Sequence, residues 1–194
     1  MRRRSMKFLK YVAILPLIGL IAAFDGVREE SEEPQELNWI SFEEAIKRNK
    51  TEPRMILVDM YTDWCGWCKR MEKDVYANKE IVSYMNKKYY AVKFNTEKYT
   101  NDIEFQGRTW KFVPPPDGGR RGIHHLAYAL MGEKASYPTT VILNEKLERL
   151  PPIPGYQKAE FMDMVLKYYG DGVYETTPWT EFQKTYKSPF LAAN

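Results

Sequence analysis

Cysteine is scarce in this sequence of 194 residues, which contains only Cys65 and Cys68. Many small exported domains depend on several disulfide bonds for their stability, and a single pair excludes that kind of scaffold. A bond between these two cysteines would close a loop of one helical turn, so it would add little to the stability of the fold. We therefore expect the pair to serve chemistry rather than structure.

Histidine is equally scarce, because the only two, His124 and His125, are neighbours. A Cys-x-x-Cys pair can form half of a zinc site, but such a site needs two further ligands. Adjacent histidines lack the spacing of the usual ligand pair, so we expect no metal. The two histidines are interpreted as a surface and helix-capping pair rather than as catalytic groups.

No apolar run reaches the roughly 20 residues that a membrane-spanning helix needs. The run over residues 11–24 has 14 residues and follows a basic segment. The basic residues are Arg2, Arg3, Arg4, Lys7 and Lys10. A basic segment before a short apolar run is typical of an export signal. Residues 1–24 are therefore predicted to be a signal peptide or, because Ile21 and Phe24 interrupt the small-residue cleavage pattern, a signal anchor. The protein is expected in the periplasm.

Outside that basic segment the chain has 24 basic and 26 acidic residues, so no large excess of one charge remains. Composition therefore gives no support to a nucleic-acid partner. A local basic excess occurs among aromatic residues later in the chain. Its members are Arg108, Lys111, Arg120 and Arg121. Because an exported protein rarely meets nucleic acid, this segment is expected to bind a protein partner or to select substrates.

Composition divides the rest of the chain into three parts. Residues 25–38 are acidic and polar and are interpreted as a linker, residues 39–170 as one globular domain, and residues 171–194 as a C-terminal extension. No internal repeat or low-complexity tract is present.

The hydrophobic pattern predicts alternating strands and helices, which is typical of an α/β domain with a central sheet. Ser41 followed by Glu44 forms a capping box before the first helix. The predicted helices cover residues 42–49, 65–76, 78–88, 124–131 and 158–169, and a last one begins at Pro178 with Thr177 as its cap. The predicted strands cover residues 55–61, 89–95, 139–143 and 147–150, the last two being paired across a turn.

Residues 99–122 are interpreted as an insertion into this order. Alternating apolar and polar residues around Gly107 predict a hairpin over residues 103–113, and proline and glycine predict a loop over residues 114–122. We expect the insertion to be unnecessary for the core and to serve recognition, so that a short Gly-Ser turn could replace it.

The segment with the two cysteines carries the chemistry. A predicted strand runs directly into Cys65, and a predicted helix follows. The first cysteine then lies at an exposed helix N-terminus, where free backbone N–H groups and the helix dipole favour a thiolate. Because the thiolate is the nucleophile, Cys65 is the expected attacking group. The spacing places Cys68 one turn inside, as the expected resolving group.

At this point the sequence resembles the thioredoxin family. The hexapeptide that begins at Trp64, Trp-Cys-Gly-Trp-Cys-Lys, is similar to the family's Trp-Cys-Gly-Pro-Cys-Lys signature, with Trp67 in place of proline. Asp59 matches the family's buried acid, Lys93 its buried lysine, and Pro138 its cis-proline. The resemblance covers about residues 50–169. It implies a thioredoxin-like fold, with a central mixed sheet flanked by helices and an inserted hairpin or loop before the cis-proline.

The resemblance also implies roles for these residues. Asp59 would accept the proton of Cys68, and burial in the apolar strand 55–61 would raise its pKa toward neutrality and suit it to this task. Lys93 would either pair with Asp59 or point its amine to solvent. The turn at Pro138 would face the cysteines and offer the backbone of Tyr137 to the substrate.

Two tryptophans flank the thiols. Trp67 lies between the cysteines and is expected to be exposed, and with Trp64 it is interpreted as a substrate-contact surface rather than as core.

We therefore expect a thiol–disulfide oxidoreductase that needs no organic cofactor and no metal. Gly66 and Trp67 add no charge that would stabilise the reduced thiolate, which favours a reductase or isomerase over a strong oxidase. Expected partners are disulfide-containing proteins and a redox partner such as a membrane electron carrier. Two alternatives stay open: a non-catalytic binding module with this fold, and an assembly factor dedicated to one client.

Overall fold

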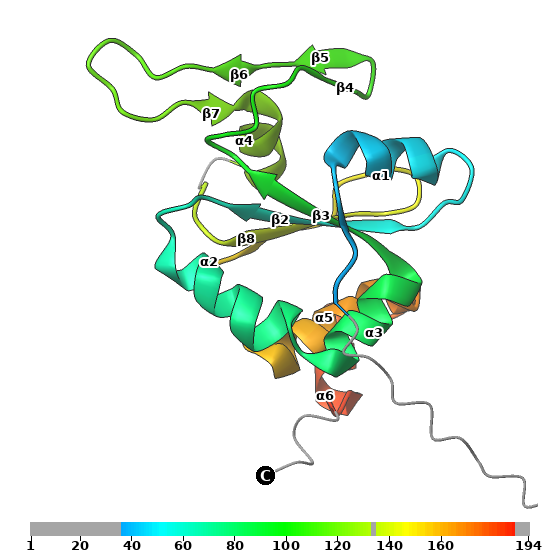
Figure 1. Ribbon diagram of the computed structural model, residues 1–194. Helices are drawn as coiled ribbons and strands as arrows, with labels where there is room; N and C mark the ends of the chain where they lie inside the picture. The colour runs from blue at the N-terminus through cyan, green and yellow to red at the C-terminus, as the bar shows by residue number, and fades with distance from the viewer. Residues whose placement is uncertain (1–35, 133–134, 189–194) are drawn as a thin grey trace, which may run out of the picture. The chain divides into compact units, whose positions relative to one another are not determined.

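The computed structural model describes residues 36–132 and 135–188. The expected signal or anchor over residues 1–24 and most of the acidic linker lie outside the described residues. Within the described part, a five-stranded sheet forms the centre of the molecule (Figure 1).

The sheet has the strand order β1-β3-β2-β8-β9. Its strands are β1 (Trp39–Ile40), β3 (Tyr89–Asn95), β2 (Met55–Tyr61), β8 (Thr139–Leu143) and β9 (Ile153–Pro154). β3 is parallel to both β1 and β2, whereas β8 is antiparallel to β2 and to β9. The predicted mixed sheet is therefore confirmed.

Helices cover both faces of this sheet. Figure 1 shows α1 (Phe42–Asn49) and α4 (His125–Met131) on one face, and α2 (Gly66–Met71), α3 (Lys79–Lys88) and α5 (Ala159–Gly170) on the other. Strand residues alternate between the two layers, because successive side chains point to opposite faces. In β2, Ile56 and Val58 join the core under α1, and Leu57 joins the core under α3.

Local sequence signals account for the helix starts. The side chain of Ser41 accepts a hydrogen bond from the N–H of Glu44 at 3.1 Å, as the capping box predicts. Asn78 caps α3 through the N–H groups of Glu80 and Ile81. The helix predicted over residues 65–76 is present, but its second half, Glu72–Tyr76, is a π-helical turn rather than α-helix.

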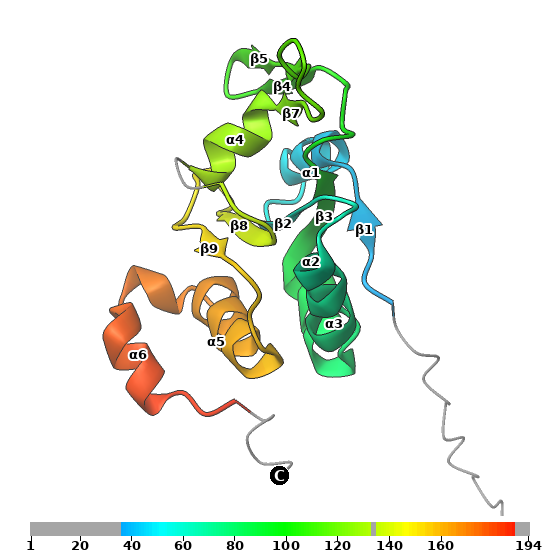
Figure 2. The same cartoon turned by 90° about the vertical axis from the view of Figure 1, so that its left-hand side faces the viewer.

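The insertion forms two small antiparallel pairs. The predicted hairpin is present as β4 (Ile103–Phe105) and β5 (Arg108–Trp110), and Gln106 and Gly107 both have positive φ angles at its turn. β6 (Phe112–Val113) then pairs with β7 (Ile123–His124) across the predicted loop. In Figure 2 these strands lie with α4 beyond α1, on the same face of the sheet.

The expectation that this insertion is unnecessary for the core is wrong for β4. Ile103 and Phe105 are buried in the core under α1, and the ring of Phe105 packs edge-on against Phe42 with centroids 5.2 Å apart. The alternation of β4 directs these two side chains inward, so the strand completes the hydrophobic layer. The loop over residues 114–122 contributes no side chain to that core.

Two further element predictions are confirmed only in part. Residues 147–150 turn back along β8 after Asn144, as predicted, but they pair with it only through a bridge between Leu143 and Arg149 and a hydrogen bond from the Leu150 N–H to the Ile142 carbonyl at 2.9 Å. The regular second strand is β9, which continues the pairing along β8. The last helix, α6 (Trp179–Thr185), begins after Pro178 as predicted, but Pro178 is its N-cap and no side chain caps it.

The C-terminal extension packs against α5 through aromatic side chains. The short turn η2 (Val173–Glu175) leads into α6, which lies beside α5 in Figure 2. The ring of Tyr168 contacts Trp179 and Phe182 with centroids 5.0 and 5.2 Å apart. Buried Asp163 accepts hydrogen bonds from Tyr186 and Ser188 and so holds the chain that follows α6.

Candidate active site

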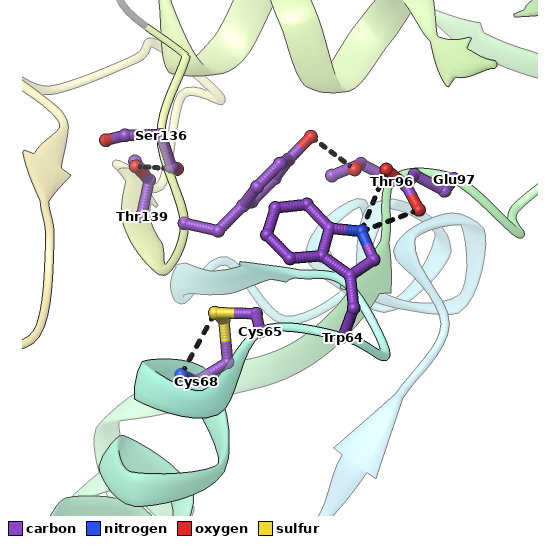
Figure 3. Close-up of a disulfide and its surroundings, with 8 residues drawn as sticks. Trp64, Cys65, Cys68, Thr96, Glu97, Ser136 and Thr139 are labelled. Carbon is purple, nitrogen blue, oxygen red and sulfur yellow. Dashed lines mark hydrogen bonds between the residues drawn. A yellow bond between two sulfur atoms is a disulfide. The ribbon is translucent and has the colours of Figure 1, made fainter. Parts of the chain in front are cut away.

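The two cysteines lie where β2 passes into α2. Cys65 is the N-cap of α2, and Cys68 lies in its first turn. The two form a disulfide bond with their Cα atoms 5.3 Å apart (Figure 3). The predicted strand–cysteine–helix arrangement is therefore present, and the chain is shown in its oxidised state.

A backbone donor points at the sulfur of Cys65. The N–H of Cys68 donates to Sγ of Cys65 at 3.1 Å, as Figure 3 shows. This N–H is one of the first-turn donors that have no partner within the helix. After reduction the same donor can stabilise a thiolate on Cys65, which lowers the pKa of a cysteine at a helix start. Sequence reasoning located this donor correctly.

Neither cysteine is exposed, which corrects the expectation of an exposed Cys65. Cys65 is 4% exposed and Cys68 6% exposed. The exposed side chains next to the cysteines are the two tryptophans: Trp64 is 52% exposed and Trp67 is 56% exposed. Exposure therefore does not distinguish the two sulfurs in the oxidised pair, and their difference lies in the groups around them.

Asp59 is buried, as its apolar strand predicts, with 2% of its surface exposed. Its Oδ1 atom has no hydrogen-bond partner. Burial raises the pKa of Asp59 to about 7, while the nearby charge of Lys93 lowers it and that of Glu72 raises it. A carboxyl group with this pKa can both accept and release a proton near neutral pH.

A cleft brings Asp59 together with one of the two cysteines. It has a volume of about 280 Å³. Its lining residues are Asp59, Tyr61, Thr62, Asp63, Cys68, Lys69, Glu72 and Lys93. Cys68 is the cysteine that lines this cleft, so the shared space favours proton exchange of Asp59 with Cys68 rather than with Cys65.

Lys93 adopts neither of the two expected arrangements. Its side chain is 22% exposed, and its amine forms an ion pair with Glu72. In the sheet register, however, Lys93 lies directly opposite Asp59. The residue is thus brought to the predicted place, but its partner comes from the π-helical turn.

The turn at Pro138 lies beside the tryptophan that precedes Cys65. The Tyr137–Pro138 peptide bond is cis. The ring of Tyr137 meets Trp64 edge-on with centroids 5.9 Å apart, and its hydroxyl is 2.6 Å from the Thr96 hydroxyl. Figure 3 shows this turn, marked by Ser136 and Thr139, on the side of the disulfide opposite Glu97. The structure therefore brings Tyr137 and Pro138 to the site.

Trp64 connects the site to the insertion. Its indole N–H donates to both carboxylate oxygens of Glu97, at 3.1 and 3.0 Å (Figure 3). The guanidinium of Arg121, from the loop between β6 and β7, lies 4.2 Å from the ring centroid. A cation at this distance over an indole face is attracted to it. The insertion thus contacts the residue next to Cys65.

Trp67 forms the other edge of the site and is exposed as expected. Arg70 lies over its ring at 5.5 Å, and the Tyr156 ring is 5.5 Å away. Arg70 also pairs with Asp74 at 3.2 Å, and Asp74 accepts the Tyr156 hydroxyl at 2.8 Å. These contacts hold Arg70 and Tyr156 against the exposed indole.

His124 corrects one part of the histidine interpretation. Its Nδ1 accepts the Leu126 N–H and so caps α4, as expected, but the residue is fully buried rather than at the surface. Nε2 lies 3.0 Å from the carbonyl of Asn101, which suits a neutral ring that donates there. Burial lowers the pKa of His124 and so favours that neutral form.

Two site residues were missed by sequence reasoning: Thr62 and Glu72. Thr62 has a buried hydroxyl without a partner and lines the cleft. Its position three residues after Asp59, just past the end of the same strand, was an available signal. Glu72 carries an ordinary surface charge in the sequence, and no local pattern marks it. Arg121 was marked only as a member of the local basic excess among aromatic residues, without its contact to Trp64.

Among the described residues, no group of three or more histidine, cysteine, aspartate or glutamate side chains is arranged to hold a metal ion. The helices in this described part are also too short or too polar for any of them to cross a membrane.

The site and fold were compared with known proteins. Residues 27–106 match the family model Thioredox_DsbH, described as a protein of unknown function, DUF255. No curated protein matches the sequence. A thioredoxin-fold protein from Helicobacter pylori is 22% identical with a TM-score of 0.51, over 68% of this chain and 79% of its own.

Two further solved structures are similar at lower TM-scores. A protein described as DsbH oxidoreductase is 18% identical with a TM-score of 0.47, over 68% of this chain and 83% of its own. A putative disulphide-isomerase from Bacteroides thetaiotaomicron is 25% identical with a TM-score of 0.48, over 75% of this chain and 99% of its own.

The sheet order, the flanking helices and the structural likeness agree on the fold predicted from the sequence. The fold together with the Cys65–Cys68 pair supports thiol–disulfide oxidoreductase chemistry in general. The chain therefore has a thioredoxin-like fold.

Proposed function

We propose that this protein is a dithiol–disulfide reductase that acts on exported, disulfide-containing proteins. The observation that carries the proposal is the asymmetry of the pair. The sulfur of Cys65 accepts a helix-start N–H, whereas Cys68 shares its cleft with the buried carboxyl group of Asp59. One sulfur is thus suited to attack as a thiolate, and the other to lose its proton later.

The reaction follows from this arrangement. The Cys65 thiolate attacks one sulfur of a substrate disulfide, which forms a mixed disulfide and releases the other substrate sulfur as a thiolate. Asp59 then accepts the proton of Cys68. The Cys68 thiolate attacks Sγ of Cys65, which breaks the mixed disulfide and releases the second substrate sulfur. The substrate has gained two electrons, and the enzyme is left as the disulfide seen here.

The oxidised enzyme must then be reduced again. We propose that the reductant is a membrane electron carrier, since the export signal expected over residues 1–24 would place the domain in the periplasm, where it would be either released or anchored. Gly66 and Trp67 add no charge to hold the reduced thiolate, and this supports the reductase direction over that of a strong oxidase.

The insertion is proposed to be the part that recognises the client or the electron donor. Arg121 from its loop lies over Trp64, and Trp64 and Trp67 are exposed on either side of the disulfide. Large exposed apolar side chains beside a reactive group are typical of a contact surface. No nucleic acid, organic cofactor or metal enters the proposed reaction.

A trapping experiment tests the proposal. Reduced Cys68→Ser protein should accumulate mixed disulfides with clients through Cys65, and Cys65→Ser protein should not. Wild-type protein should also reduce a generic disulfide substrate such as insulin, with Asp59→Asn slowing the second step near pH 7. Absence of insulin reduction, together with partner binding that survives loss of both cysteines, would support the binding-module alternative. Trapping of one client alone would identify a dedicated assembly factor.

A further inference from the structure

The ammonium group of Lys93 is held at three points near the mouth of the cleft. Glu72 forms an ion pair with it. The rings of Trp39 and Tyr61 lie on it with centroids 5.4 and 5.3 Å from Nζ. A cation within about 6 Å of an aromatic face is attracted to it, so all three contacts favour the same position.

This position is unexpected because of what lies opposite in the sheet. Lys93 of β3 is the register partner of Asp59 in β2, and Asp59 has a buried carboxyl oxygen without a hydrogen bond. A buried carboxylate without a partner is costly, and an ion pair with a neighbouring lysine would relieve that cost. The lysine is near enough to affect the charge of Asp59, yet its ion pair is made with another acid.

Glu72 owes its place to the helix that carries the cysteines. It follows Cys68 by four residues, its backbone is α-helical, and its N–H donates to the carbonyl of Cys68, so the two side chains lie on the same face one turn apart. The π-helical turn begins at Glu72, and such turns are frequent at functional sites. Glu72 is half-exposed and lines the same cleft as Asp59 and Cys68.

We propose that Glu72 is a positioning residue that, with the rings of Trp39 and Tyr61, holds the Lys93 ammonium group away from Asp59, so that Asp59 stays free to exchange a proton with Cys68. This inference rests on the proposed function, in which proton exchange between Asp59 and Cys68 is a step of the reaction. It goes beyond the proposed function because it assigns a second acid to the site, Glu72, which acts on Asp59 through Lys93.

Other charges near Asp59 are already accounted for. The titratable groups that face it are Tyr61, Asp63, Cys68, Lys69, Glu72, Tyr76 and Lys93. Asp63 pairs with Lys98, and the Tyr76 hydroxyl bonds to that of Thr140 on β8. Beyond burial itself, Lys93 and Glu72 are the charges that move the pKa of Asp59. The Lys93–Glu72 pair is therefore the adjustable part of this environment.

The test is the carboxyl titration of Asp59, followed by carbon NMR in the oxidised protein, where the cysteines do not titrate. Glu72→Gln keeps the shape of the side chain and frees Lys93. We expect the pKa of Asp59 to fall from about 7 to about 6 or lower, because an opposite charge close by favours the carboxylate. The pH midpoint of mixed-disulfide release should move down by the same amount.

A second background separates positioning from simple charge. Glu72→Gln should move the pKa of Asp59 far less when Lys93 is already Met, because no freed lysine remains to approach it. Equal shifts in both backgrounds would overturn the proposal, since Glu72 would then act by its own charge alone, and so would an unchanged pKa in the single variant. Glu80→Gln on α3 is the matched control and should change nothing. Thermal melting confirms the fold of each variant.

This titration needs no turnover, so its outcome is independent of the proposed function. If the wild-type protein fails to reduce disulfides, the reductase proposal is wrong. The role of Glu72 in placing Lys93 is then still decided by the NMR titration. An active wild-type protein with no shift in Glu72→Gln would overturn the role of Glu72 alone.

Discussion

At the scale of single residues, Asp59 makes stability depend on pH. Its pKa is about 7 in the folded chain against an ordinary value of 3.8, so the folded state holds this proton more tightly than the unfolded state does. The stability that this proton provides is complete below about pH 4 and is lost as pH rises through about 7. A difference of that size corresponds to about 4 kcal/mol.

Replacing Asp59 by Asn should therefore stabilise the oxidised protein at pH 8 by up to about 4 kcal/mol and change little at pH 3.5. Urea unfolding of both proteins at the two pH values measures this. Asp117→Asn, in the loop after β6, is the control and should behave as wild type at both. Equal stability of Asp59→Asn and wild type at pH 8 would show that Asp59 is not a buried acid with a raised pKa.

The two thiols should differ in reactivity although both are nearly buried. In the reduced protein, Cys65 is next to a helix-start N–H, whereas Cys68 lies beside a carboxyl group that opposes a second negative charge. Iodoacetamide at pH 7 should thus label Cys65 at least about tenfold faster than Cys68, as mass spectrometry of timed samples would show. Equal rates would contradict the assignment of the attacking sulfur.

Residue burial was predictable where it followed from the local pattern. The apolar run around Asp59 indicated that its carboxyl group is buried, and the position of Trp67 between the cysteines indicated that it is exposed. The partner of Lys93 was not predictable, because Glu72 belongs to the helix after the cysteines and Lys93 to a strand, and no local pattern shows that the two side chains meet.

At the scale of elements, the insertion divides into a structural and a recognition part. Phe105 of β4 is 4% exposed and packs on Phe42, so Phe105→Ala should lower the free energy of unfolding by about 3 to 5 kcal/mol. Urea denaturation measures this change. Trp110→Ala, at a half-buried position of β5, is the comparison and should have a smaller effect. A negligible effect of Phe105→Ala would mean that β4 is not part of the core.

Residues 114–121 alone can be replaced by a short Gly-Ser link. This replacement should leave the fold and insulin reduction intact. When it is made in the Cys68→Ser protein, it should lower the amount of client trapped as mixed disulfide. Gly122 is retained because a Cβ there would lie 2.4 Å from both the Phe112 ring and the Val113 carbonyl. Arg121→Ala is the narrower variant, since Arg121 is the loop residue over Trp64. Undiminished trapping in both variants would place recognition elsewhere.

Most elements could be predicted because their signals are local. A short apolar run marked β2, alternation marked the hairpin of β4 and β5, helical periodicity marked α3, and Ser41 marked the start of α1. The pairing expected between residues 139–143 and 147–150 is present only as a bridge between Leu143 and Arg149. The regular second strand is β9, whose two residues have too short a pattern to indicate a strand.

At the scale of the whole molecule, the family pattern around the Cys-x-x-Cys motif was enough to predict the fold. Contacts between segments far apart in the sequence became known only from the structure. The sequence placed Asp59, the cysteines and Pro138 in one site, because each belongs to a recognisable segment of the family pattern. The contact between Arg121 and Trp64 joins segments more than fifty residues apart through two surface side chains. Such a contact depends on how the β6–β7 loop folds back, which no local pattern specifies.

The most direct test of the central claim is a redox titration of the Cys65–Cys68 pair against glutathione or dithiothreitol buffers of known potential, with the two states separated by alkylation and mass. A reductase should have a low potential, between about −200 and −270 mV, because nothing between the cysteines stabilises the reduced thiolate strongly. A potential near −120 mV would contradict the account, since the protein would then be a strong oxidant that donates its disulfide.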